Sequence, residues 1–322
     1  MTRSFVLRGA ALVISLALLA WVLADARWRG VGERLAQLDA ASLAGITALF
    51  AASYAMRAAR VFGEFRDELA ERNSAKRQGY LSILRLTLIH NALVNVVPFR
   101  AGELAFPLLL ARWFGVATER AMVSLLWLRA QDACVVLVLA ALVWPALPIA
   151  LRIAAIAAFV AGAWAVPAWA RRHPGADAHG ALSPGSSKGK RLARIRAALG
   201  RSTRSNKSGW FWTIANWSVK IAAEAWLLVL ALGLPASDAA TGALGAIGAE
   251  LAAILPLQGV AGFGTFEAGT AALLRTQGVP VVTGVQAALA LHAVVLALAL
   301  AAGGLAAVLL PTAAPAASKS GS

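Results

Sequence analysis

Long apolar segments constrain this chain more than any other feature of its sequence. A helix needs about 20 apolar residues to cross the hydrocarbon core of a bilayer. Six segments are long enough, namely residues 5–24, 43–62, 121–145, 149–170, 210–231 and 283–310. The sequence therefore predicts an all-α polytopic membrane protein with six full spans.

The composition excludes the main alternatives. Hydrophobic residues make up 60% of the 322 residues and charged residues 14%, whereas soluble chains have about 45–50% and about 25%. Soluble globular and disordered chains are thus excluded. The single cysteine, Cys134, excludes an internal disulfide framework. The first apolar segment resembles a signal peptide, but we expect it to remain as an uncleaved first span.

Two further apolar regions, residues 81–114 and 239–275, are broken in the middle. Pro, Gly and charged residues interrupt the first region at 98–103 and the second at 256–267. Backbone groups freed by such breaks cannot face lipid, so they must be buried in protein or line a wet cavity. We expect both regions to form re-entrant hairpins.

The placement of the positive charges predicts the orientation. The chain carries 30 Lys and Arg against 15 Asp and Glu, a formal charge of +15. Ten of the basic residues lie in the loop 171–209, which holds one acidic residue, Asp177. Cytoplasmic loops of membrane proteins collect Lys and Arg. This loop, the basic segment 63–80 with Arg57 and Arg60 at its entrance, and both termini are therefore expected on the cytoplasmic side, and no nucleic-acid partner is expected.

The sequences that follow the two breaks are similar. The first runs from Glu103 to Gly115-Val116, and the second from Glu267 to Gly278-Val279. We expect a first repeat at 1–148, a second at 149–310 and a flexible tail at 311–322. With the orientation above, the first hairpin opens from the cytoplasm and the second from the opposite side. Inverted repeats with broken helices are typical of transporters that bind their cargo near the membrane midplane.

Polar residues inside apolar segments supply the candidate site. An ionisable residue there costs about 2.5–3.5 kcal/mol on insertion, so it usually faces a cavity or a partner. The candidate substrate-binding residues are Asn91, Asn95, Arg100, Glu103, Arg129, Asp132, Glu250, Glu267 and His292. No catalytic residue, metal ligand or cofactor is expected, because no nucleophile–base set or metal-ligand spacing occurs.

Several candidates have a structural alternative. Arg129 and Asp132 are three residues apart on one helix face and either pair with each other or serve a cavity. Arg100 lies beside helix N-termini in the first break, which suits a phosphate or carboxylate head group; alternatively it ties the turn with Glu103. His292 matches the position of Arg129 in the other repeat, although an interior histidine often does no more than complete a hydrogen bond.

The two breaks resemble a known family. Asn91-x3-Asn95-x2-Pro98-x-Arg100-Ala101-Gly102-Glu103 is similar to the first signature of the lysylphosphatidylglycerol-synthase transmembrane, flippase-like family, and Gly259-x2-Gly262-x-Gly264-x2-Glu267 is similar to the second. The resemblance implies a bacterial-type inner-membrane protein that moves lipids or lipid-linked head groups between leaflets. Anionic phospholipids, hopanoids and polyprenyl-linked lipids are the implied cargoes. These residues contain no soluble aminoacyltransferase domain, so we expect a transporter rather than a synthase.

Two other functions remain open from the sequence. One is a membrane-embedded transferase that acts on a lipid-linked substrate, although the longest external loop, about 25–42, has no tight acidic pair. The other is a non-transporting membrane partner that holds a lipid-biosynthesis enzyme through the basic loop 171–209.

Overall fold

The described part of the chain is helical throughout. The structure is a computed structural model and describes residues 27–72, 79–172, 187–203, 206–254 and 260–311. These residues contain no strand, and their α-helices are α2 (Arg27–Ala36), α3 (Ala40–Glu64), α4 (Arg66–Arg72), α5 (Gly79–Val96), α6 (Ala105–Phe114), α7 (Thr118–Val143), α8 (Ile149–Arg172), α9 (Ser187–Ser202), α10 (Asn206–Leu232), α11 (Ala239–Ile254), α12 (Thr265–Arg275) and α13 (Val281–Leu309). Three short 3₁₀ helices are η1 (Pro98–Leu104), η2 (Ala236–Asp238) and η3 (Val260–Gly262). The all-α prediction is confirmed.

Three described helices are long and apolar enough to cross a membrane. They are α7, α10 from Lys207 onward, and α13. Helices α2 and α3 form a pair bent by 95°, which gives a fourth span if the pair is counted as one. The apolar part of α8, Ile149–Ala165, is shorter, and the predicted span 5–24 lies outside the described residues. Membrane-spanning helices are thus supported, whereas the number six stays a prediction.

Both broken regions have the predicted interruption. In the first, η1 separates α5 from α6, and in the second, η3 lies before α12. Helices α6 and α12 have 10 and 11 residues, and at 1.5 Å per residue they reach roughly half the thickness of the hydrocarbon core. The two short arms therefore fit re-entrant segments better than full spans.

The short arms α6 and α12 end in similar caps. Gly115 and Gly278 both have positive φ, 60° and 84°, a conformation that glycine adopts without the steric cost of a Cβ. The amide of Val116 then donates to the carbonyl of Leu110 at 3.3 Å, and that of Val279 to the carbonyl of Leu274 at 3.2 Å. The Gly-Val pairs noted in the sequence are thus helix caps that lead into α7 and α13.

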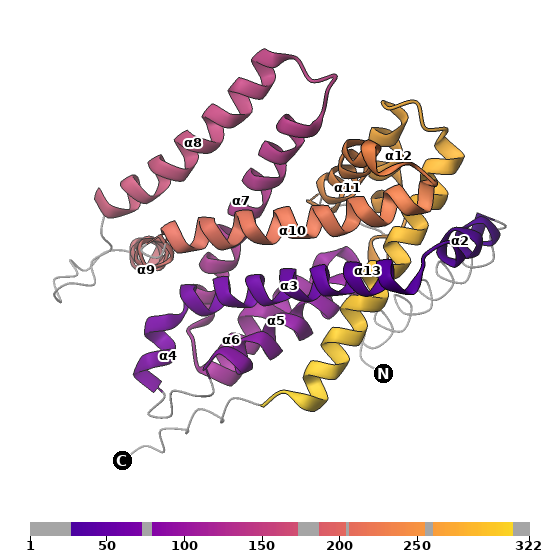
Figure 1. Cartoon of the computed structure of the whole chain (residues 1–322). Coiled ribbons are helices and arrows are strands. Elements are labelled where there is room, and N and C mark those ends of the chain that lie inside the picture. The colour runs from indigo at the N-terminus through magenta and orange to yellow at the C-terminus, as the bar shows by residue number, and fades with distance from the viewer. Residues whose placement is uncertain (1–26, 73–78, 173–186, 204–205, 255–259, 312–322) are drawn as a thin grey trace, which may run out of the picture. The chain divides into compact units, whose positions relative to one another are not determined.

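The chain forms two compact units. The first unit comprises residues 1–49, 92–103 and 221–300, and the second comprises residues 50–91, 104–220 and 301–322. In the first unit α11 packs against α12 (Figure 1) at two glycines, Gly248 and Gly269. A Cβ built on either glycine would lie 2.3 Å from the carbonyl oxygen of the other. The two helix backbones therefore touch, and nothing larger than glycine fits.

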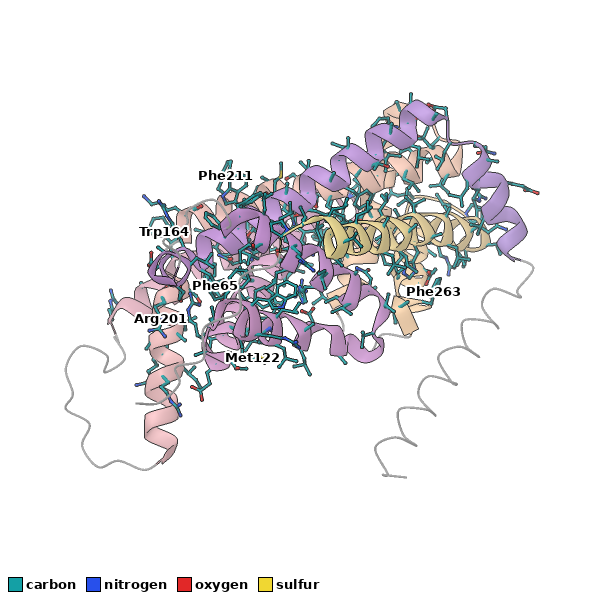
Figure 2. The ribbon with its side chains drawn as sticks, turned by 90° about the horizontal axis from the view of Figure 1, so that it is seen from below. Phe65, Met122, Trp164, Arg201, Phe211 and Phe263 are labelled. Carbon is teal, nitrogen blue, oxygen red and sulfur yellow. The ribbon has the colours of Figure 1, made fainter. Side chains whose placement is uncertain are left out.

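The second unit has a core of buried apolar residues from the segment between α3 and α7. Phe65, Ile83, Leu86 and Leu110 are fully buried there. Helices α7 and α8 lie side by side in this unit (Figure 1). By contrast, Trp164 of α8 and Phe211 of α10 are 72% and 61% exposed, and Figure 2 shows their labels at the rim of the ribbon. Large exposed apolar side chains on apolar helices are what contact with lipid requires.

Candidate functional site

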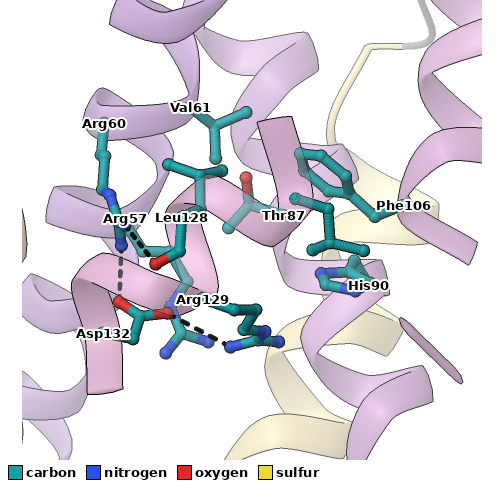
Figure 3. A pocket seen from close by; sticks show the side chains of 10 residues that line it. Arg57, Arg60, Val61, Thr87, His90, Phe106, Leu128, Arg129 and Asp132 are labelled. Atoms are coloured by element: carbon teal, nitrogen blue, oxygen red, sulfur yellow. Dashed lines mark hydrogen bonds and ion pairs between the residues drawn. The ribbon is translucent and has the colours of Figure 1, made fainter. Parts of the chain in front are cut away.

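A polar pocket lies inside the second unit (Figure 3). Four helices line it, and all of the lining residues belong to this unit. They are Arg57, Arg60 and Val61 of α3, Thr87 and His90 of α5, Phe106 of α6, and Leu125, Leu128, Arg129 and Asp132 of α7. On both α3 and α7 the charged pair has a spacing of three residues, which places both members on one helix face.

Asp132 is the centre of the polar network. Its Oδ1 accepts hydrogen bonds from Arg60 Nη1 at 2.6 Å and from the indole Nε1 of Trp217 at 2.9 Å. Its Oδ2 accepts a bond from Arg129 Nη1 at 3.3 Å. The carboxylate is buried and its donors are fixed by α3, α7 and α10. Asp132 is therefore held by the protein itself and is a poor ligand for anything that enters.

Arg60 is also occupied by protein partners. Besides Asp132, its Nη2 donates to the carbonyl of Leu128 at 2.6 Å and to Oε1 of Gln131 at 2.9 Å. The residue is 4% exposed. A buried charge needs such partners, because desolvation costs several kcal/mol per ion. The Arg60–Asp132 pair thus joins α3 to α7.

Arg57 differs from Arg60 in its hydrogen-bond partner. Its Nη1 donates to the neutral amide oxygen of Asn91 at 3.0 Å, and among the described residues it forms no ion pair with a carboxylate. The pocket lining carries three guanidinium groups and one carboxylate, a net charge of +2 when His90 is neutral. A guanidinium matches the oxygens of a phosphate or carboxylate geometrically. The pocket therefore favours an anion.

The cavity between these side chains is small. Its volume is ≈30 Å³, enough for about one or two water molecules. Arg129 has a side chain that is 29% exposed, and Arg57 is also only part-buried. A head group larger than water therefore requires these two side chains to move toward solvent, which their partial exposure permits.

A second polar contact lies in the first unit, at the second break. His292 of α13 and Glu267 of α12 are 3% and 5% exposed. Oε1 of Glu267 lies 2.6 Å from Nδ1 of His292, and Oε2 accepts the amide hydrogen of Gly264 at 2.6 Å. The other ring nitrogen, Nε2, lies 2.9 Å from the carbonyl oxygen of Ala261. The pair ties the break to α13, and we call Glu267, His292 and the Ala261 carbonyl the clasp.

The structure distributes the predicted site residues over both units. Arg129 and Asp132 line the pocket of the second unit, where Asn91 accepts a hydrogen bond from Arg57, and Glu267 and His292 meet in the clasp of the first. The remaining candidates also belong to the first unit by position, namely Asn95, Arg100, Glu103 and Glu250. Glu250 is 5% exposed, and the side chain of Arg100 lies outside the described part. The intrahelical pairing of Arg129 with Asp132 is present in the structure.

Sequence reasoning missed Arg57 and Arg60 as site residues. It assigned them to the positive charge at the membrane surface, because a basic segment follows them. Their spacing of three inside the predicted span 43–62 matches that of Arg129 and Asp132, and this repeated spacing was the available signal.

Not every buried ion pair of the second unit lines the pocket. Arg120 Nη1 lies 2.7 Å from Oε1 of Glu64 and Nε lies 2.9 Å from Oε1 of Glu68. The same Nη1 also donates to the hydroxyl of Ser202 at 2.7 Å. These partners saturate the guanidinium, so the cluster fastens α3, α4, α7 and α9 and offers no group to a ligand.

The comparison with known proteins agrees with the membrane character of the helices. No curated protein and no solved structure shows a significant similarity to the chain. One family matches, described as the lysylphosphatidylglycerol synthase TM region, and the match covers residues 9–303. Because this match spans most of the chain, the protein belongs to the lysylphosphatidylglycerol synthase transmembrane-region family of membrane proteins with lipid-related function.

Proposed function

We propose that the protein is an inner-membrane translocator that moves a lipid with an anionic head group between the two leaflets. The observation that carries this proposal is the pocket of the second unit, where three arginines face one carboxylate inside a helical membrane protein. Charged groups among membrane helices are costly and usually mark a path for a polar cargo.

The head group is the part of a lipid that such a pocket serves. A lipid crosses the apolar core at a cost set by its polar head, and a guanidinium lowers that cost by replacing water around phosphate oxygens. Arg57 is the side chain best placed for this, since its hydrogen-bond partner Asn91 is neutral and it forms no ion pair with a carboxylate among the described residues. Arg129 supplies a second, partly exposed guanidinium.

The two breaks support a transporter architecture. In each half, a helix is followed by a 3₁₀ helix, a short arm with a Gly-Val cap and a long helix, which are α5–α7 and α11–α13. The residues of the first break up to Glu103 and all of the second break belong to the same unit. These features support our proposal that 1–148 and 149–310 are inverted repeats, with both breaks near the midplane and both termini cytoplasmic.

The test is leaflet exchange in vesicles that contain the purified protein. Arg57→Gln removes the guanidinium proposed for the head group, and Arg66→Gln is the matched control because Arg66 is an exposed arginine on α4. We expect Arg57→Gln to slow the exchange of a fluorescent anionic phospholipid about tenfold or more, the equivalent of one charge-assisted hydrogen bond. Equal exchange rates in the two variants would contradict a role of the pocket in lipid translocation.

A further inference from the structure

The clasp contains a hydrogen-bonding conflict that one proton resolves. Both ring nitrogens of His292 face acceptors, a carboxylate oxygen of Glu267 and the carbonyl oxygen of Ala261. A neutral imidazole has one donor nitrogen and one acceptor nitrogen. A neutral ring beside an ionised Glu267 therefore leaves one nitrogen lone pair pointing at an oxygen lone pair.

One additional proton satisfies every contact. If the ring carries it, both nitrogens donate, to Glu267 and to Ala261. If Glu267 carries it, the acid donates to Nδ1 while Nε2–H donates to Ala261. In either form Oε2 of Glu267 still accepts the amide hydrogen of Gly264. The two forms hold the same number of protons, so the geometry counts one shared proton without assigning it to either residue.

The carbonyl that depends on this proton lies in strained backbone. Ala261 has φ 53° and is the one described non-glycine residue with positive φ. This conformation is unfavourable for an L-residue, because its Cβ comes too close to the following carbonyl oxygen. Gly262 and Gly264 follow with φ 83° and 89°. Such backbone persists only where surrounding contacts hold it, and the described contact to the Ala261 carbonyl comes from His292.

The aromatic rings around His292 also favour a clasp that holds the shared proton. The rings of Phe263 and Phe266 lie 4.4 and 4.5 Å from the ring of His292 between centroids, with interplanar angles of 34° and 29°. These rings keep water from the imidazole, which is 3% exposed. An aromatic face also attracts a cationic group. A lost contact to Ala261 is thus not replaced by solvent while the break stays closed.

We propose that Glu267 and His292 form a proton-binding site that holds the turn at Ala261 while it carries one shared proton and releases the Ala261 carbonyl when that proton leaves to water. In this account the proton is the ligand, and the strained turn at Ala261 is the element that responds. The inference concerns the backbone of the break and stands independently of which lipid, if any, the protein moves.

The first unit contains other titratable groups besides the clasp. They include Glu250 of α11, Glu224 of α10, Arg275 at the exposed end of α12, and Arg34 of α2, which donates to Gln286 of α13. Glu250 and Glu224 are buried carboxylates. The test must therefore separate the clasp from them, above all from Glu250, because α11 packs directly on α12.

Glu267→Gln is the decisive variant, because its amide reproduces the protonated clasp without a titrating carboxyl group. The amide nitrogen donates to Nδ1, Nε2–H donates to Ala261, and the amide oxygen accepts from Gly264. The readout is backbone hydrogen exchange of the segment 261–267 in the full-length protein in lipid discs, corrected for intrinsic chemistry, between about pH 5 and about pH 8.

We expect exchange in the wild type to rise about tenfold across this range as the contact is lost. In Glu267→Gln it should stay slow throughout, and in His292→Ala it should be fast throughout. Glu250→Gln, the matched control, should keep the wild-type step. A wild-type segment without the step, a Glu267→Gln segment that retains it, or a Glu250→Gln segment that loses it would each overturn the proposal. Lipid exchange is not measured, so a failure here leaves the proposed function untouched, and the reverse also holds.

Discussion

Arg60 of α3 donates from Nη1 to Oδ1 of Asp132 on α7 at 2.6 Å, and both residues are buried. This ion pair divides the arginines of the pocket by role. The terminal nitrogens of Arg60 donate to three protein acceptors, whereas the neighbouring Arg57 donates to the neutral amide of Asn91. The pair therefore joins α3 to α7, and Arg57 is the guanidinium that we propose for binding a head group.

Removing the carboxylate should destabilise the second unit. Asp132→Asn leaves the buried Arg60 without its counter-charge, and breaking one side of a buried pair costs about 3–5 kcal/mol. We expect the free energy of unfolding in detergent, measured by denaturant titration, to fall by that amount. The control is Glu119→Gln, which removes an exposed partner of Arg194 and should cost less than about 1 kcal/mol. Similar losses in both variants would contradict the assignment.

Arg120 should prove structural rather than functional. Arg120→Met leaves Glu64 buried without its cation, so we expect a loss of about 3–5 kcal/mol in the free energy of unfolding. At a temperature where the variant stays folded, anionic lipid exchange should remain near the wild-type rate, because the cluster does not line the pocket. A folded Arg120→Met variant without exchange would show that the cluster acts in transport.

The contact between α11 and α12 makes a prediction about packing. Gly248→Ala or Gly269→Ala places a Cβ 2.3 Å from a carbonyl oxygen, so the helices must separate, at a cost of about 1–3 kcal/mol. Gly304→Ala is the control, since a Cβ there meets nothing within 4 Å. It should be neutral or stabilise helix α13 by up to about 1 kcal/mol. Thermal unfolding of the three variants measures the contrast.

Arg57→Lys should separate charge from geometry. Lysine keeps the positive charge but lacks the planar fork that binds two oxygens at once. We therefore expect an exchange rate for anionic lipid between those of the wild type and Arg57→Gln, with stronger inhibition by salt than in the wild type. A rate equal to that of the wild type would mean that the positive charge at position 57 is sufficient and that the planar guanidinium is not needed.

The sequence predicted the features that depend on local chemistry. Pro98 and the glycines from Gly259 to Gly264 located both breaks. The Gly-Val pairs were interpreted as a sign of an internal repeat, and the structure shows them as caps at Gly115 and Gly278. Buried polarity was also foreseen for Asp132, Glu267 and His292. These inferences rest on proline, glycine and desolvation, which act within a few residues of the chain.

Features set by distant contacts could not be read in the same way. The grouping of residues 92–103 with 221–300 depends on packing between segments more than a hundred residues apart. The partner of His292 and the difference between Arg57 and Arg60 depend on which side chain lies opposite each of them. A pattern along one helix shows that a charge needs a partner but not which partner it has.

The selectivity of lipid exchange tests the central claim most directly. The measurement is the ratio of exchange rates for an anionic and a zwitterionic phospholipid with the same acyl chains, in vesicles that contain wild type, Arg57→Gln or Arg66→Gln. The account predicts that the wild type and Arg66→Gln favour the anionic lipid and that Arg57→Gln lowers this ratio about tenfold. A wild-type protein with no preference, or a ratio that Arg57→Gln leaves unchanged, would contradict the role of the arginine pocket in recognising the head group.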